Sequence, residues 1–192
     1  RVFKGDSDKI ISMDDEEIYG KVIHQLSFKS ALEQVPPVLS KYKIVTNRVN
    51  KKYIQDLINE NKLVRANNKQ WSYDADCSTF ASLISLRQLV KNENLKHVVS
   101  FHSSIHRSKE FKLLNDQLNN FSSEFGTIHS SQISGKDSSG VRKDVLTKFK
   151  SIEPSLITNA RCLTEGVDIP MIDAVLFADP KKSTVDIVQA AG

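Results

Sequence analysis

One short segment of the chain combines a glycine with two carboxylates and could form part of a ligand site. The segment is TNARCLTEGVDIP, residues 158–170, in which Gly166 follows Glu165 and precedes Asp168 by two positions. Glycine lets a ligand come close to the backbone because no Cβ atom is in the way. A carboxylate two residues later can then accept a hydrogen bond from a ligand hydroxyl. The alternative is an ordinary strand-to-turn connection in which Asp168 bonds its own backbone.

Three further segments carry hydroxyl, glycine or arginine groups that suit a phosphate. VVSF ends a predicted strand at Ser100 and Phe101, ISGKDSSGVR joins a strand to a helix, and STVDIVQAAG opens the last predicted helix. Phosphates bind well at backbone N–H groups, helix N-termini and arginine side chains. If these segments lie next to the first one in space, they form a continuous surface that can bind phosphates.

The elements that must position these segments alternate along the chain. Runs of apolar residues predict strands at 42–49, 97–101, 124–130, 155–160 and 174–179. The helices between them have inner faces that we expect to comprise Ile54, Leu57 and Ile58; Phe80 and Ile84; Phe111, Leu114 and Leu118; and Val141, Val145, Leu146 and Phe149. This alternation predicts a parallel sheet with helices on both faces, in which ligands bind beyond the carboxyl ends of the strands.

An N-terminal arm, residues 1–40, is predicted to precede a main domain at 41–192. The acidic run MDDEE and the pair Pro36 and Pro37 set the arm apart. A period-two pattern predicts a half-buried strand in the arm, with one side formed by Ile18, Val22, Leu26 and Phe28. The chain begins at Arg1 and stops at VQAAG inside a predicted helix, so we expect it to be a piece of a larger protein.

Composition favours a folded chain with a basic surface. Hydrophobic residues make up 39% and charged residues 26% of the 192 residues, which is enough for a core. The net charge of +4 and the pI near 9.0 are compatible with a polyanionic partner, but charge alone favours a lysine-rich surface without such a partner. The two cysteines, Cys77 and Cys162, exclude a disulfide framework and a cysteine-rich zinc site. With no apolar run of membrane-spanning length and no signal peptide, we expect a cytoplasmic protein without a membrane partner.

Other short patterns have ordinary explanations that outweigh a chemical one. His102 and His106 are spaced to share a metal, but no glutamate follows His102, so we expect no metal and a solvated helix start. Trp71 could stack on a base, but local packing is the better reading. DPKKS, residues 179–183, lacks the paired carboxylates of a nuclease, and we expect a loop that caps the last helix.

In chain order, VVSF, SGKDSSGVR, TNARCLTEGVDIP and QAAG resemble motifs IV, IVa, V and the start of VI in the C-terminal RecA-like lobe of superfamily 2 DNA helicases and translocases. The form TEGVDIP is similar to that of bacterial helicases related to the motor subunits of type I and type III restriction enzymes. The resemblance covers 42–192. It implies a RecA-like α/β fold, with the arm as a linker from the preceding lobe.

The resemblance also implies a role for each matching residue. Four residues would face ATP: Gly166, Asp168, Gln189 and Gly192. Seven would lie along the nucleic-acid backbone: Ser100, Phe101, Ser134, Gly135, Arg142, Thr158 and Asn159. The implied partners are single- or double-stranded DNA and the N-terminal RecA-like lobe of the same protein.

No catalytic set is complete in this sequence. SGKDSSG fails the phosphate-loop pattern, because Ser130 stands where the first glycine belongs and Asp137 where a serine or threonine follows the lysine. The family's motif VI continues into arginines that lie beyond Gly192. ATP and Mg²⁺ would thus act in the full-length protein, and we expect the isolated chain to bind neither and to be inactive. The alternative is a non-catalytic α/β module that binds nucleic acid or protein.

Overall fold

The computed structural model describes residues 15–37, 39, 41–46, 48–61, 73–121, 126–160, 171–179 and 187. The chain divides into two compact units, Arg1–Ile44 and Val45–Gly192, and each is described by itself. None of the helices in the described ranges has both the length and the apolar character needed to cross a bilayer.

The first unit contains two short helices where the sequence predicted a strand. They are α1, Glu16–Tyr19, and α2, Phe28–Glu33. The acidic run starts the first of them, because the Asp15 carboxylate accepts a hydrogen bond from the N–H of Glu17 at 3.0 Å. Ser27 caps the second in the same way, accepting from the N–H of Ser30 at 3.0 Å. The predicted strand is wrong, since its side chains find no sheet to cover them: Val22 is 80% exposed.

The predicted strand at 42–49 is also wrong in the residues that the structure describes. Residues 42–46 and 48–49 form no strand, and Ile44 is 80% exposed. Only Val49 packs against the core, just before helix α3, Lys51–Asn61. The Asn50 side chain accepts a hydrogen bond from the N–H of Lys52 at 2.8 Å and so helps to start that helix.

A four-stranded parallel sheet forms the centre of the second unit. The strands are β1, His97–Phe101; β2, His129–Ser134; β3, Ser155–Ala160; and β4, Ala174–Phe177, and their order across the sheet is β2-β3-β1-β4. The three pairs of neighbouring strands are all parallel, which confirms the predicted fold class. Strand β2 begins later than the predicted 124–130, because Ile128 bonds to the side chain of Asn119 instead of to a strand.

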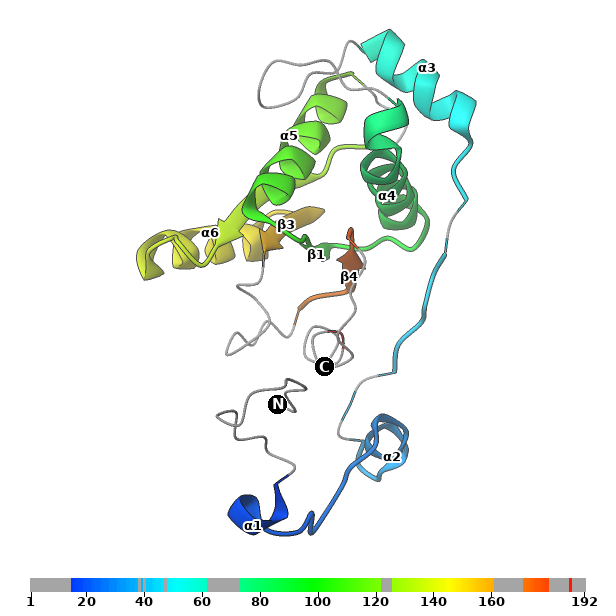
Figure 1. Ribbon diagram of the computed structural model, residues 1–192. Coiled ribbons are helices and arrows are strands. Elements are labelled where there is room, and N and C mark those ends of the chain that lie inside the picture. Colours follow the sequence, from blue (N-terminus) through cyan, green and yellow to red (C-terminus); the bar gives the residue numbers. More distant parts are fainter. Residues whose placement is uncertain are drawn as a thin grey trace. The chain divides into compact units, whose positions relative to one another are not determined.

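Helices cover both faces of this sheet. Helices α4, Tyr73–Asn92, and α5, Ile105–Phe121, lie with α3 on one side (Figure 1). Their core includes Val98 of β1 and Leu156 of β3. Helix α6, Ser139–Ser151, packs on the other face through Phe149, against the next residues along the same strands, Val99 and Ile157. Because side chains alternate across a strand, this pattern of neighbours defines three layers.

Most predicted core positions are confirmed. Ile54, Ile58, Phe80, Ile84, Phe111, Leu114, Leu118 and Phe149 are buried, and Val145 and Leu146 are partly buried. The side chain of Leu57 lies outside the described part. Val141 is 50% exposed, so its predicted inward position is wrong. It lies in the first turn of α6, where the chain has just left the end of β2 and the sheet gives no surface to pack on.

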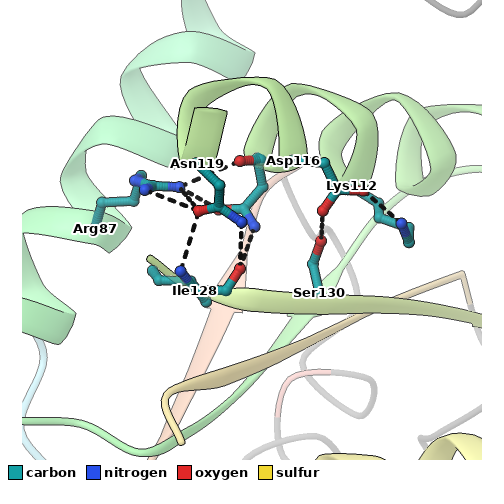
Figure 2. Close-up of polar contacts among 7 residues, drawn as sticks. Arg87, Lys112, Asp116, Asn119, Ile128 and Ser130 are labelled. Carbon is teal, nitrogen blue, oxygen red and sulfur yellow. Dashed lines mark hydrogen bonds and ion pairs between the residues drawn. The ribbon is translucent and has the colours of Figure 1, made fainter. Parts of the chain in front are cut away.

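A buried polar network ties two helices to the start of β2. The Arg87 side chain on α4 is fully buried and donates a hydrogen bond to the side-chain oxygen of Asn119 at 3.0 Å (Figure 2). It also donates to the side-chain oxygen of Asn115 at 2.6 Å and to the carbonyl of Gly126. Both asparagine amides donate to the carbonyl of Ile128, at 2.9 and 2.8 Å. Burial lowers the pKa of Arg87 to about 10, so the guanidinium stays charged at neutral pH.

Candidate functional site at the carboxyl edge of the sheet

The strand register brings the carboxyl ends of all four strands together. Phe101 pairs with Asn159 on one side and with Phe177 on the other. Ile133 also pairs with Asn159, and Ser134 pairs with the next residue of β3, Ala160. The segments that the sequence singled out after β1, β2 and β3 therefore start from one edge.

The predicted nucleic-acid residues within β1 and β3 are buried in the sheet. Ser100, Phe101, Thr158 and Asn159 have exposed fractions of 0–2%. The Ser100 hydroxyl lies 2.9 Å from Nε2 of His102, and the Asn159 amide donates to the carbonyl of Ser100 at 3.0 Å. These side chains hold the strand ends together, and direct contact of any of them with a ligand stays a prediction.

Thr158 differs from its neighbours because its hydroxyl is unsatisfied. The residue is fully buried, and Oγ1 has no hydrogen-bond partner within the described part of the chain. A buried hydroxyl without a partner costs roughly 1–3 kcal/mol. The backbone pairing of β3 with Ser100 of β1 therefore fixes the position of Thr158, and its hydroxyl does not.

The connection from β2 to α6 is a tight polar turn with an accessible backbone. The Asp137 carboxylate accepts hydrogen bonds from the N–H of Ser134 at 2.6 Å and from its hydroxyl at 3.0 Å, and Ser138 caps the helix. Gly135 is exposed, and a Cβ atom there would meet nothing within 4 Å. Arg142 follows in the first turn of α6 and is half-buried. Among the predicted residues that are described, Gly135 and Arg142 offer the accessible groups.

Behind β1, a second polar cluster was not predicted as a site. Asp179 follows β4, and its Oδ2 accepts hydrogen bonds from the N–H of Ser103 at 2.7 Å and from Nε of Arg107 at 3.1 Å. Its Oδ1 lies 2.7 Å from a terminal nitrogen of Arg107. The predicted role of DPKKS, to cap the last helix, falls on residues outside the described part and stays a prediction; Asp179 itself bonds to the start of α5. The sequence did contain a signal for Asp179, because this residue lies close to the carboxyl end of a strand, as Ser134 does.

His102 lies inside this cluster and is not solvated, so the predicted solvated helix start is wrong for it. The residue is 2% exposed and its ring packs against that of Phe111, with 4.8 Å between centroids. Burial lowers the pKa of His102 to about 4; Asp179 opposes this shift and Arg107 adds to it. His106 instead faces Glu110 at 3.4 Å. In the described ranges, no group of three or more possible metal ligands occurs.

The carboxylate of Asp179 is held in its charged form. Burial by itself raises the pKa of this carboxyl, but the hydrogen bonds from Ser103 and the guanidinium of Arg107 outweigh that effect, and the pKa lies below its ordinary value. The side chain of Arg107 remains 43% exposed although it is paired.

The predicted ATP-facing residues lie outside the described part of the chain. These are Gly166, Asp168, Gln189 and Gly192, and Trp71 and Cys162 lie outside it as well. Their roles stay predictions.

In open parallel sheets with helices on both faces, ligands bind beyond the carboxyl ends of the strands. The model of the family described as "Helicase conserved C-terminal domain" matches residues 81–192. The chain belongs to this family, which confirms the resemblance to a helicase C-terminal lobe; the similarity to the motor subunits of restriction enzymes stays a prediction.

Several known proteins are similar to this chain. The chain is 31% identical over 96 residues to a protein of Saccharomyces cerevisiae (strain ATCC 204508 / S288c) named "Putative ATP-dependent helicase IRC3", a match that covers 50% of this chain and only 11% of that protein. Two solved structures are similar at 17% identity. One is domain 2 of the DEAD-box helicase Mss116p bound to an RNA duplex, with a TM-score of 0.48 over 60% of this chain and 43% of that one. The other is the C-terminal part of the Fun30 ATPase domain, with a TM-score of 0.46 over 58% and 35%.

Proposed function

We propose that this chain is the C-terminal motor lobe of an ATP-dependent DNA helicase or translocase. In this role it contacts the nucleic-acid backbone and completes an ATP site shared with an N-terminal RecA-like lobe. The observation that carries the proposal is the register of the sheet, which starts the segments after β1, β2 and β3 from one edge. Those segments match helicase motifs in sequence, and the family match covers them.

The nucleic-acid contact is proposed to run along the β2–α6 turn. There the backbone of Gly135 is exposed, and Arg142 is half-buried at the start of a helix beside the exposed Lys143. Backbone N–H groups, a helix start and an arginine are the groups that bind phosphates. Such contacts carry little sequence information, so binding should be indifferent to sequence.

The ATP contact is proposed for Gly166, Asp168, Gln189 and Gly192, as the resemblance implies. The phosphate loop and its Mg²⁺ would come from the other lobe, because this sequence lacks the pattern for them. When bound, ATP with Mg²⁺ would supply the energy for movement, and this chain would supply one wall of its site. We expect the isolated chain to show no ATP turnover above a buffer blank.

Binding of a fluorescent single-stranded DNA oligonucleotide by the isolated chain, followed by anisotropy at several salt concentrations, tests the nucleic-acid contact. We expect weak binding, with a Kd in the range of ~10⁻⁴ to 10⁻⁶ M, that weakens steeply with salt. Arg142→Ala should reduce the salt slope by about 0.7, the value for one single-strand phosphate. Lys150→Ala removes an equal charge from the other end of α6 and is the matched control.

Two results would count against this role. Binding that does not depend on salt would remove the phosphate contact and favour a non-catalytic binding module. An equal loss of slope in Arg142→Ala and Lys150→Ala would mean that the net charge of α6, and not the carboxyl edge, attracts the strand. Tighter binding of a matched RNA oligonucleotide would change the substrate from DNA to RNA.

A further inference from the structure

Strand β4 carries a carboxylate at each end, and both tie it to the chain around β1. At the amino end, Oδ2 of Asp173 accepts hydrogen bonds from the N–H groups of Lys96 and His97 at 2.7 and 2.9 Å. At the carboxyl end, Asp179 accepts from the N–H of Ser103, as described above. The two contacts have the same backbone chemistry but lie at opposite edges of the sheet.

Only the contact at the carboxyl edge includes an arginine side chain with a free face. Two nitrogens of Arg107 point to the two oxygens of Asp179, at 3.1 and 2.7 Å, and this two-point contact fixes the plane of the guanidinium. Its side chain is still 43% exposed. A guanidinium carries five N–H donors on three nitrogens, and the contacts with Asp179 involve two of these nitrogens.

The same carboxylate also fixes the backbone on which Arg107 stands. Ser103 and Ser104 are exposed residues between the end of β1 and the start of α5. Asp179 holds the first of them, and the Ser104 hydroxyl accepts a hydrogen bond from the N–H of Arg107 at 3.2 Å. Without Asp179, both the side chain of Arg107 and the turn before it lose their anchor.

We propose that Arg107 is a further phosphate-contact residue of the nucleic-acid interface and that Asp179 is the positioning residue that orients it. The strand end that the sequence selected, Ser100 and Phe101, has buried side chains, so contact from β1 falls to the residues that follow it. Arg107 lies at the carboxyl edge in the first turn of α5, the helix that follows β1. Arg142 lies at the same edge in the first turn of α6, the helix that follows β2. This inference rests on the proposed nucleic-acid contact.

The test compares two substitutions that remove the same charge. Asp179→Asn and Asp173→Asn each delete one negative charge, and by charge alone each should strengthen binding of a polyanion slightly. Positioning predicts the opposite for Asp179→Asn, because an arginine that is no longer oriented contacts the phosphate less well. In the anisotropy titration with single-stranded DNA we expect binding about threefold to tenfold weaker for Asp179→Asn, and unchanged or slightly tighter for Asp173→Asn.

Arg107→Gln should weaken binding by a similar factor and reduce the salt slope by about 0.7. The double variant, Arg107→Gln with Asp179→Asn, should bind no more weakly than Arg107→Gln alone, because the two residues act as a unit. Folding of each variant is checked by circular dichroism, and Arg107→Gln carries the test if Asp179→Asn does not fold.

The outcomes separate the two proposals. If the unmodified chain does not bind single-stranded DNA, the proposed nucleic-acid contact fails and this inference fails with it. If the unmodified chain binds but Asp179→Asn behaves as Asp173→Asn does, only the positioning role is overturned. If Arg107→Gln leaves both affinity and slope unchanged, Arg107 does not contact phosphate.

Discussion

The two edges of the sheet use polar groups in different ways. At the amino edge, the charge of Arg87 is surrounded by amide and carbonyl oxygens and has no access to solvent. At the carboxyl edge, the charged groups of Arg107 and Arg142 remain partly accessible, and Gly135 exposes its backbone. The Arg87 guanidinium is buried, and although its Nε has no hydrogen-bond partner among the described residues, a ligand cannot reach it, whereas exposed charged groups can still bind a ligand. The amino edge should therefore govern stability and the carboxyl edge ligand binding.

The largest effect that this comparison predicts is on stability at the amino edge. Arg87→Met keeps the length of the side chain but removes the Arg87 donors to Asn115 and to the exposed Gly126, and the carbonyl and side-chain oxygens of buried Asn115 each lose a partner. Each such loss costs about 1–3 kcal/mol, so we expect the free energy of unfolding to fall by roughly 3–5 kcal/mol in a urea titration. Gln88→Met, at the next and half-buried position of α4, is the control and should change it by less than about 1 kcal/mol. If Arg87→Met lowered the free energy of unfolding as little as the control does, the network would not stabilise the packing of the two helices on the start of β2.

The second effect is a pH dependence that belongs to the carboxyl edge. Burial lowers the pKa of His102 from its ordinary 6.5 to about 4, so between these values the unfolded chain binds a proton that the folded chain does not. The free energy of unfolding should therefore fall as the pH drops from 6.5 towards 4, by at most about 3 kcal/mol for this residue. Asp179, whose pKa is lowered below the ordinary 3.8, adds its own loss only at still lower pH.

His102→Gln removes the titrating group and should flatten this part of the pH profile. Urea titrations at pH 4.5 and pH 7 compare the variant with the unmodified chain. His106→Gln is the control, because that side chain is 67% exposed. An equal pH dependence in the unmodified chain and in His102→Gln would assign the loss of stability to other groups.

Sequence reasoning located β1, β3 and β4 because their runs are largely apolar, but it placed β2 too early, at 124–130, because the strand HSSQIS has only one apolar residue, Ile133. Runs such as HVVSF and SLITNA read as buried strands in any packing, and the alternation with helices then fixes a parallel order. The same rule failed at Ile18 and Ile44, where an alternating pattern has no neighbouring strand and the side chains stay exposed. A period of two shows that a segment could pair, but pairing also needs a partner strand.

The sequence predicted only those parts of the candidate site that lie at the ends of strands. The sequence placed Ser100, Ser134 and Thr158 at one edge, and the register confirms that placement. The sequence predicted both strands to be buried, yet the resemblance assigned Ser100 and Thr158 to a ligand contact, and the structure buries both side chains. Sequence reasoning also missed the pair of Asp179 and Arg107, which lie 72 positions apart in the chain and meet only when β4 lies beside β1.

The smallest effect concerns the start of α6, where the carboxyl edge carries its exposed turn. The Ser138 hydroxyl accepts a hydrogen bond from the N–H of Val141 at 3.3 Å and so caps this helix. Ser138→Ala should lower the free energy of unfolding by about 1 kcal/mol, the usual cost of a lost cap, and Ser139→Ala, one residue inside the helix, should change it by less.

Since Arg142 lies in the same turn and its N–H donates to the carbonyl of Ser138, a frayed turn would also loosen that side chain. We thus expect Ser138→Ala to weaken DNA binding by no more than about twofold, because the backbone carbonyl of residue 138 remains in place. A loss of binding as large as that of Arg142→Ala would make the cap itself part of the phosphate contact, and a loss of stability near that of Arg87→Met would end the distinction between the two edges.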